Sequence, residues 1–351
     1  MDDRGFAGAQ FLAVALFIAA AGVAMSLYLG SSLAYQKKSV DAEALRQTLE
    51  RAARAALDLM AKDLDEEADS PHDLVWSELA DVASRATSGA TSGDVGGAAP
   101  EVTLTVRDVS SGLNPNFVRK DLLEKTSLGR LMDPRCSPQS LQQFREDEGL
   151  STQGAFYSQF FTPEARSLVT CYGWANLNIT DEFVLRSLYA SLTGYPAGAE
   201  VFHTKVQGLL MAKRLVQRSE LASFLGADAA ALFPVICVEP PLNINYVDPL
   251  LLTAILGDPD YGLKDPEAHA AAILDSRAAG ALTASDIQRL LGVQPGHILL
   301  QYFGAHTWFW EVDAQAGGQR CSLIAARIPS LDAIPTSTKA VFRVVETRFE
   351  R

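Results

Sequence analysis

The sequence predicts an α+β protein: a long N-terminal helix packs on an antiparallel sheet, and a large helical domain is inserted between the first strand and the last ones. Three observations predict this arrangement. An apolar N-terminal run continues as an amphipathic pattern to about residue 70, with neither Gly nor Pro from residue 32 onward. Alternating strand patterns occur near residue 105 and again after residue 305. Helical patterns with a repeated Asn-x-Asn motif fill the interval.

The N-terminal helix divides into two halves. Residues 6–30 are apolar and long enough to cross a bilayer core, which predicts a transmembrane half. Residues 31–70 form the amphipathic half, where Leu45, Leu49, Ala53 and Leu57 recur every four residues. The flank before the apolar run, Met-Asp-Asp-Arg-Gly, lacks the basic region of a secretory signal peptide. If unbroken, the two halves form a rod of about 90 Å; the alternative is a kink near residues 30–32.

The predicted sheet is assembled from two distant parts of the chain. Residues 71–118 supply its first part, where a Gly-, Ala-, Ser- and Thr-rich stretch over 83–100 predicts a loop. Residues 296–351 supply the rest, with a hairpin turn at Gly317 and Gly318. The strands are expected at 102–109, 306–315, 319–328 and 340–350.

The inserted helical domain, residues 119–295, contains an internal repeat. Asn-x-Asn occurs three times in the chain, as Asn114 and Asn116, Asn176 and Asn178, and Asn243 and Asn245. The last two copies align over longer segments, which predicts two related units of about 171–226 and 237–292. Asp181 and Asp248 follow these copies at the same spacing, and Pro249 comes next, as expected for helix N-caps and a first helical residue.

Two interpretations of the Asn-x-Asn motif follow from its chemistry. Asn side chains accept hydrogen bonds from nearby backbone N–H groups, so the motif suits a turn that leads from a strand into a helix. The alternative is that these amides line a ligand site. The first interpretation is favoured, because the motif sits directly between a strand pattern and a helix pattern.

The four cysteines leave two alternatives open. They show no C-x-x-C spacing, and the five histidines are scattered, so zinc is not expected. If the body of the protein is exported, one or two disulfides are expected. Cys171 and Cys237 precede the two aligned motifs and are the favoured pair. The alternative is four buried thiols.

Composition and motif content exclude several function classes. The net charge is −12, with 42 acidic and 30 basic residues, which argues against nucleic acid as a partner. A nucleic-acid-binding helix-hairpin-helix module remains an alternative, but the hairpin at 257–260 is acidic. We find no nucleophile elbow, phosphate loop or dinucleotide-binding glycine pattern. The sequence therefore predicts a protein that is not an enzyme.

The N-terminus resembles that of type IV pilins and pseudopilins. Gly5 followed by Phe6 matches their processing site, which implies that a prepilin peptidase removes a leader, residues 1–5, and that Phe6 becomes N-methylated. Most of these proteins carry Glu at the fifth mature position, where its carboxylate pairs with the first amine of a neighbouring subunit. Here that position is Gln10. Its missing charge indicates a subunit with no neighbour above it; the alternative is a weak substitute for Glu.

The chain as a whole resembles the minor pseudopilins of the K class in type II secretion systems. The residues that carry this resemblance are Asp108, Gly112, Asn114 and Asn116 after an early strand, Asn243 and Asn245 before a helix-hairpin-helix-like unit, and the Gly-Gly hairpin before a final strand. The resemblance implies a pilin-like fold with two helix-hairpin-helix-like units. The region 119–170 fits this pattern least well.

The resemblance also implies a function. Such proteins cap a periplasmic pseudopilus, support the initiation of its assembly, and serve the export of folded proteins across the outer membrane. The implied partners are minor pseudopilins of the I and J classes, the major pseudopilin, the prepilin peptidase and the inner-membrane assembly platform. The implied location is the inner membrane, crossed once, with most of the chain in the periplasm. The alternative is a minor pilin of a type IV pilus.

Some members of this class bind calcium in the helical insertion. In the segment GDPDYGLKDPE, residues 257–267, this would assign oxygen ligands to Asp258, Asp260, Asp265 and Glu267. The spacing is not that of an EF-hand. The alternative is a solvated acidic loop.

Overall fold

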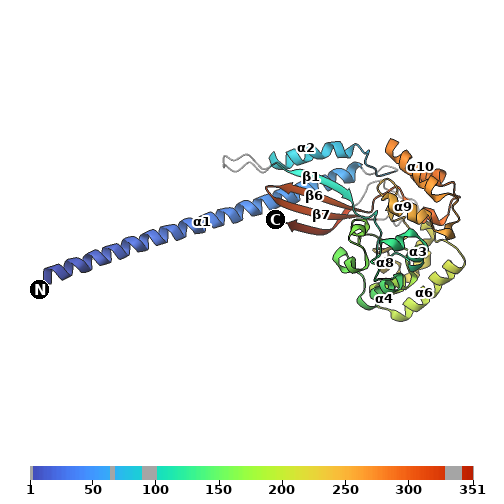
Figure 1. The fold of residues 1–351 in the computed structure, drawn as a ribbon, viewed down its shortest axis with the longest axis horizontal. Helices are drawn as coiled ribbons and strands as arrows, with labels where there is room; N and C mark the ends of the chain where they lie inside the picture. Colours follow the sequence, from blue (N-terminus) through green and yellow to red (C-terminus); the bar gives the residue numbers. More distant parts are fainter. Residues whose placement is uncertain (1–2, 64–67, 89–100, 329–341, 351) are drawn as a thin grey trace.

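A computed structural model describes residues 3–63, 68–88, 101–328 and 342–350, and within α1 it leaves most side chains before residue 35 undescribed. Figure 1 shows a helical rod, a sheet in the middle, and a helical domain at the end far from the N-terminus. This arrangement confirms the predicted α+β class, with a long helix against an antiparallel sheet and many helices inserted between its strands.

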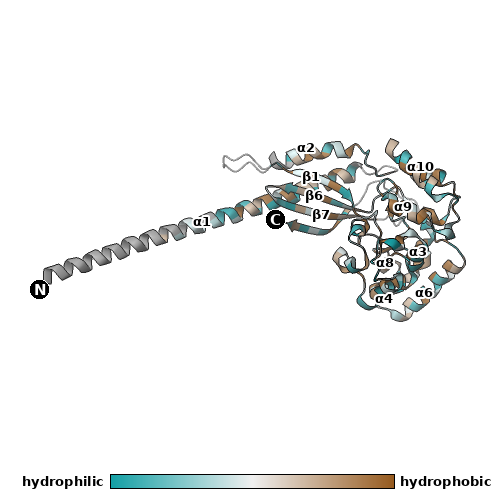
Figure 2. Ribbon diagram, in the orientation of Figure 1, coloured by the Kyte–Doolittle hydropathy of each residue, from teal (hydrophilic) through white to brown (hydrophobic). Residues whose placement is uncertain are grey.

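The rod is helix α1 (Asp3–Asp63), which runs unbroken through Gly30. Its first part projects away from the body, and its last part lies on the sheet (Figure 1). Leu49, Ala53, Ala56 and Met60 are fully buried, so the predicted stripe at three- and four-residue steps is the packing face. Figure 2 shows hydrophobic residues on α1 where it lies against the sheet. No helix within the described residues is long and apolar enough to cross a membrane.

The sheet has four antiparallel strands in the order β1-β6-β7-β8. Their bounds are β1 Thr103–Asp108, β6 Phe309–Ala316, β7 Gln319–Arg327 and β8 Phe342–Glu350. All four lie within a few residues of the expected strands, and the hairpin turns at Gly317 and Gly318, both with positive φ. Trp310, Val312 and Leu323 point from one face into the core shared with α1. On β6 the alternating residues Glu311 and Asp313 are also buried, and they pair with arginines.

Helix α2 (Val75–Ser88) was not expected, because the turn-rich sequence after residue 66 favoured a loop. The loop prediction for 83–100 is wrong for residues 83–88, which belong to α2. Residues 89–100 lie outside the described residues. Val75, Leu79, Val82 and Ala83 form a buried stripe at helical spacing. Tertiary packing of this stripe against α1 outweighs the weak helix propensity of the Ser- and Thr-containing end.

The inserted domain consists of short helices between β1 and β6. The α-helices are α3 Lys120–Lys125, α4 Pro138–Glu148, α5 Glu182–Thr193, α6 Pro196–Met211, α7 Arg218–Leu225, α8 Ala229–Leu232, α9 Pro249–Leu256, α10 Pro266–Ala279 and α11 Ala284–Leu291. The 3-10 helices are η1 Ser127–Leu131, η2 Gly154–Phe160, η3 Glu164–Leu168, η4 Gly226–Asp228, η5 Pro259–Tyr261 and η6 Ile298–Gln301. Two-residue strands join them: β2 Ala175–Asn176, β3 Ile236–Cys237, β4 Leu242–Asn243 and β5 Phe303–Gly304.

Parallel strand pairs close this domain into three units rather than the two predicted. Unit A begins at Leu113, which bridges Val169. Unit B begins at β2, which pairs with β3. Unit C begins at β4, which pairs with β5. Unit B runs from β2 to β3, and unit C runs from β4 to β5. Unit A contains the short helices α3 and α4 together with the 3-10 helices η1, η2 and η3.

Candidate functional site

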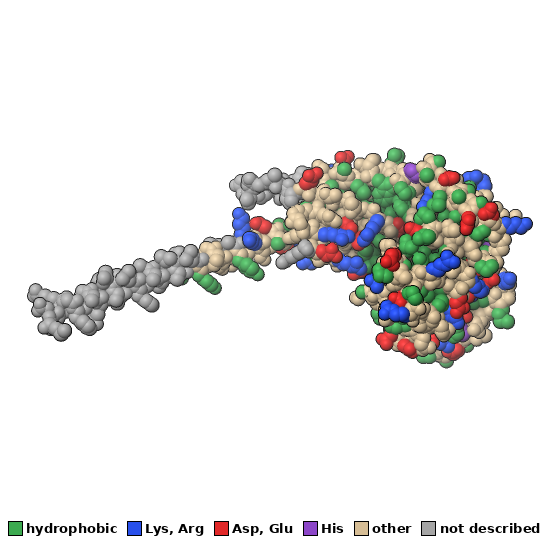
Figure 3. Space-filling view, viewed as in Figure 1, with side chains coloured by type: hydrophobic (Ala, Val, Ile, Leu, Met, Phe, Trp, Pro, Cys, Tyr) green, Lys and Arg blue, Asp and Glu red, His purple; other side chains and the backbone are tan. Residues whose placement is uncertain are grey.

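The projecting part of α1 is the first candidate surface. Met25, Tyr28, Tyr35 and Val40 are 65%, 73%, 77% and 67% exposed, an unusual level for large apolar side chains. Figure 3 shows hydrophobic side chains standing out from the rod beyond the body. The predicted processing residues Gly5 and Phe6, and Gln10, belong to the part of α1 whose side chains lie outside the described residues.

The three Asn-x-Asn motifs form the same turn. In each, the side-chain oxygen of the first Asn accepts the backbone N–H of the second at 2.9 Å, in the pairs Asn114 to Asn116, Asn176 to Asn178 and Asn243 to Asn245. The carbonyl of the first Asn also accepts the backbone N–H four residues later. These bonds support the turn interpretation of the motif.

The second Asn of each motif joins the turn to a distant segment. Its amide donates to a backbone carbonyl and accepts the N–H of the same residue, a two-bond pair that resembles a β-bridge. Asn116 pairs in this way with Ser151, 35 residues away. Asn178 pairs with Val216, 38 residues away. Asn245 pairs with Leu282, 37 residues away.

The aspartates that follow the motifs are helix caps, as predicted. Asp181 accepts the N–H groups of Phe183 and Val184 at the start of α5, and Asp248 accepts that of Leu250 at the start of α9, with Pro249 at the first helical position. Unit A has Arg119 at the equivalent place, and α3 has no side-chain cap.

A buried arginine, Arg145, and a half-buried one, Arg277, also belong to the turns, and no sequence pattern predicted them. Arg145 donates to the carbonyls of Pro115, Asn116 and Val118, and Arg277 donates to those of Ile244 and Val247. Burial lowers the pKa of both guanidinium groups from the usual value. Arg145 lies six positions before Ser151, the residue that pairs with Asn116, and Arg277 lies five positions before Leu282, the residue that pairs with Asn245. This spacing is the sequence signal that could have predicted them.

A buried aspartate connects the rod, the sheet and unit C. Asp69 is fully buried just after α1, and its carboxylate accepts two bonds from Arg327 at 2.7 and 3.0 Å and one from the N–H of Thr307 at 2.7 Å. Its carbonyl accepts the amides of Asn243 and Asn245. Thr307 in turn donates to Asp108, whose pKa burial raises. No local sequence signal links these residues, because they lie far apart in the chain.

The predicted disulfide is not formed. Cys171 and Cys237 are free and buried, and Cys136 and Cys321 are also free. The register of β2 and β3 places Asn176, not Cys171, opposite Cys237, so the two cysteines do not occupy equivalent strand positions. The structure therefore supports the alternative of buried thiols for three of the four cysteines, whereas Cys136 is partly exposed. Burial raises the pKa of Cys171 and Cys321 to about 11, and that of Cys237 further.

The predicted calcium ligands have other tasks. Asp258 caps η5, Asp265 caps α10, and Asp260 forms an ion pair with Lys125. Glu267 lies in the first turn of α10. Among the described residues, we find no group of three or more His, Cys, Asp or Glu side chains that could hold a metal ion.

Comparison with known proteins gives little further information. No family model matches the chain. No curated protein matches it either. Among solved structures, it is similar to a chain of the GspK-GspI-GspJ complex of the type 2 secretion system from enterotoxigenic Escherichia coli. The identity is 13% and the TM-score 0.31, over 90% of this chain and 99% of that one.

Proposed function

We propose that this chain is a minor pseudopilin that caps the tip of a type II secretion pseudopilus. In this proposal it supports the initiation of pseudopilus assembly and the export of folded proteins across the outer membrane. It acts as a structural subunit rather than an enzyme, anchored once in the inner membrane with its body in the periplasm. Its partners are the I-class and J-class minor pseudopilins and the major pseudopilin.

The observation that carries the proposal is the division of α1. The helix packs on the sheet from about residue 45 onward, and before that it leaves apolar side chains exposed. Exposed apolar side chains gathered on a helix mark a surface that a membrane or neighbouring helices cover. Both environments exist in a filament whose subunits are drawn from a membrane.

The shape of the molecule supports a position at the tip. The helical domain lies at the end of the molecule farthest from the N-terminus (Figure 1). A domain of this size would occupy the space that the next subunit needs above it. Gln10 agrees with this position, because a subunit without an upper neighbour needs no charged partner for that neighbour's amine.

Processing is the first experimental test. The full chain is expressed with a prepilin peptidase, and the mature mass is measured by mass spectrometry. We expect loss of residues 1–5 and addition of one methyl group. The variant Gly5→Leu should keep its leader, whereas the matched control Gly8→Leu should be cleaved. An unchanged mass for the native chain, or normal cleavage of Gly5→Leu, would contradict the pilin-like assignment.

Secretion is the second test, and it separates the two filament systems. In a strain that lacks this gene, type II substrates should remain in the periplasm, while surface pili and their motility persist. The full chain supplied in trans should restore export. Loss of pili with normal secretion would instead indicate a minor pilin of a type IV pilus.

A further inference from the structure

An open cleft of about 720 Å³ lies where the sheet meets units A and C. Its first wall is the sheet face that carries Arg107, Glu311 and Ile324, which lie opposite one another on adjacent strands and alternate with the side chains that pack on α1. Its other walls are the segment after η3 in unit A and the turn of unit C with α10. Ligand sites are common at junctions of this kind, and ligand pockets usually measure roughly 300–1,000 Å³.

Four arginines line this cleft, and they come from all of its walls. Arg107 and Arg348 lie on the sheet, Arg166 lies on η3 of unit A, and Arg277 lies on α10 of unit C. The chain as a whole has a net charge of −12, so this group of guanidinium groups runs against its overall charge. The planar fork of arginine matches a carboxylate and binds it through two parallel hydrogen bonds.

Three carboxylates also line the cleft, and each has a task inside the protein. Glu311 is 4% exposed and pairs with Arg107, whose side chain remains 64% exposed. The carboxylate of Asp108 accepts hydrogen bonds from its own loop, and Asp248 caps α9. At the sheet wall, an entering ligand therefore meets a guanidinium group rather than a carboxylate.

Arg166 and Arg277 keep their charges unpaired. Within the part of the chain that the structure describes, neither forms an ion pair, and both donate to main-chain carbonyls, Arg166 to that of Ser158 at 3.2 Å. An anion that binds between partly enclosed cations is screened by salt less than one on an open surface. These two arginines are therefore the strongest positions for an incoming carboxylate.

Apolar side chains lie between the arginines. They belong to Val106, Leu168, Val169, Leu251 and Ile324. A free inorganic anion would leave this apolar lining in contact with water. A ligand that carries carboxylates on either side of an apolar group would cover it and pair with the arginines as well.

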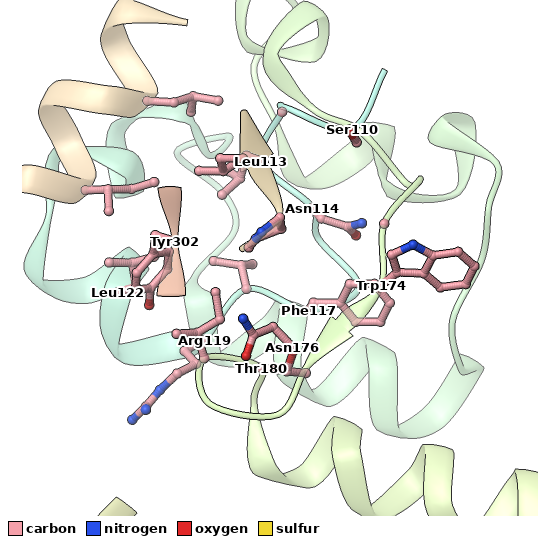
Figure 4. Close-up of a pocket in the computed structure, with 18 of the residues that line it drawn as sticks. Ser110, Leu113, Asn114, Phe117, Arg119, Leu122, Trp174, Asn176, Thr180 and Tyr302 are labelled. Atoms are coloured by element: carbon pink, nitrogen blue, oxygen red, sulfur yellow. The ribbon is translucent and has the colours of Figure 1, made fainter. Parts of the chain in front are cut away.

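The smaller cavity of about 60 Å³ in the interior has a different character. Its labelled lining is largely apolar, with Leu113, Phe117 and Tyr302 among its residues (Figure 4). Figure 4 also shows Arg119 pointing away from this cavity, and its guanidinium group pairs with Asp121. The charged surface available to a ligand is thus that of the cleft.

We propose that this cleft binds an acidic, extended segment of a partner polypeptide, in which an apolar residue lies between acidic ones. Carboxylates of the segment pair with Arg166 and Arg277, and the apolar side chain covers the lining between them. Recognition of acidic motifs by arginine clusters is a common mode of peptide binding. This proposal rests on the charge and lining of the cleft and does not depend on a role in secretion.

Fluorescence anisotropy of a rhodamine-labelled peptide tests the proposal with the full chain in an uncharged detergent. The probe has the sequence Glu-Asp-Leu-Asp-Glu. We expect saturable binding that weakens as the salt concentration rises. The matched neutral peptide Gln-Asn-Leu-Asn-Gln should bind at least about tenfold more weakly, because it offers no charge-assisted hydrogen bonds. Replacement of its central Leu by Gly should also weaken binding of the acidic probe.

Variants of the arginines test the site itself. Arg166→Gln removes an exposed cation from the cleft, and affinity for the acidic probe should fall about fivefold or more. Arg166→Lys keeps the charge but loses the planar fork, so its affinity should lie between the two. Arg348→Gln should also weaken binding. The matched control is Arg289→Gln, an exposed arginine of α11 outside the cleft, which should bind as the native chain does.

Circular dichroism of each variant checks its fold, and Arg348→Gln decides the matter if Arg166→Gln does not fold. No saturable binding of the acidic probe, or equal binding of the neutral peptide, would overturn the proposal. Native affinity in both glutamine variants would overturn it as well. Displacement of the probe by inorganic phosphate or by glycerol phosphate at equal concentration would identify a free anion or a lipid headgroup as the ligand, and either result would contradict a polypeptide partner.

Discussion

The second Asn of each motif joins the turn to a segment of its unit that lies 35 to 38 positions later in the chain. Asn245 is 5% exposed and makes both bonds of its pair with Leu282 inside the protein. Asn245→Ala leaves a buried N–H and a buried carbonyl without partners, so we expect a loss of about 2–3 kcal/mol in the free energy of unfolding. Denaturant titration measures this loss.

The control for that variant is Gln143→Ala, which removes an exposed side-chain bond to Asp147. Its effect should stay within about 0.5 kcal/mol. Equal stability of Asn245→Ala and Gln143→Ala would show that the two-bond pair does not stabilise the unit.

The cysteines give a second prediction at this scale. Cys136 is partly exposed, whereas Cys171, Cys237 and Cys321 are buried with raised pKa values. A thiol reagent at pH 8 should therefore modify Cys136 first, because the thiolate is the reactive form. In denaturant without reductant, all four thiols should react. If only two thiols reacted, the other two would be joined in a disulfide, as predicted for Cys171 and Cys237.

At the scale of elements, α1 has two segments with different neighbours. Leu49 is fully buried against the sheet, so Leu49→Ala should lower the free energy of unfolding of the body by about 2–5 kcal/mol. Val40 is 67% exposed, and Val40→Ala should change that stability by less than about 0.5 kcal/mol. In the proposed function, Val40→Ala should still reduce co-purification with the other pseudopilins.

Thermal unfolding of the detergent-solubilised chain measures the first effect, and quantitative pull-down measures the second. If Val40→Ala destabilised the body as much as Leu49→Ala, the projecting segment would be part of the core rather than a surface for neighbours.

The elements also show what the sequence could and could not predict. The packing stripe of α1, the four strands and the caps at Asp181 and Asp248 follow from local periodicity and turn chemistry. Helix α2 was not predicted, because its short buried stripe lies in a stretch with many Ser and Thr residues. Unit A was not predicted because three of its five helical segments are 3-10 helices, which lack the 3.6-residue period, and its α-helices α3 and α4 are short. The ion pair of Asp69 and Arg327 was not predicted, because the two residues lie 258 positions apart in the chain.

At the scale of the whole molecule, the position in a filament depends on the first residues of the mature chain. Gln10→Glu would place a carboxylate within the apolar run, where an unpaired charge costs about 2.5–3.5 kcal/mol on insertion scales. For a subunit at the tip, no amine arrives from above to pair with it. We therefore expect normal or slightly reduced secretion and no change in pseudopilus length, measured by export assays and by electron microscopy of sheared filaments.

The control Gln10→Leu, which also lacks the charge, should behave like the native chain. Long filaments built from Gln10→Glu subunits would show that the missing charge, rather than the bulk of the helical domain, excludes this chain from the shaft, and the proposed physical basis of the tip position would be wrong.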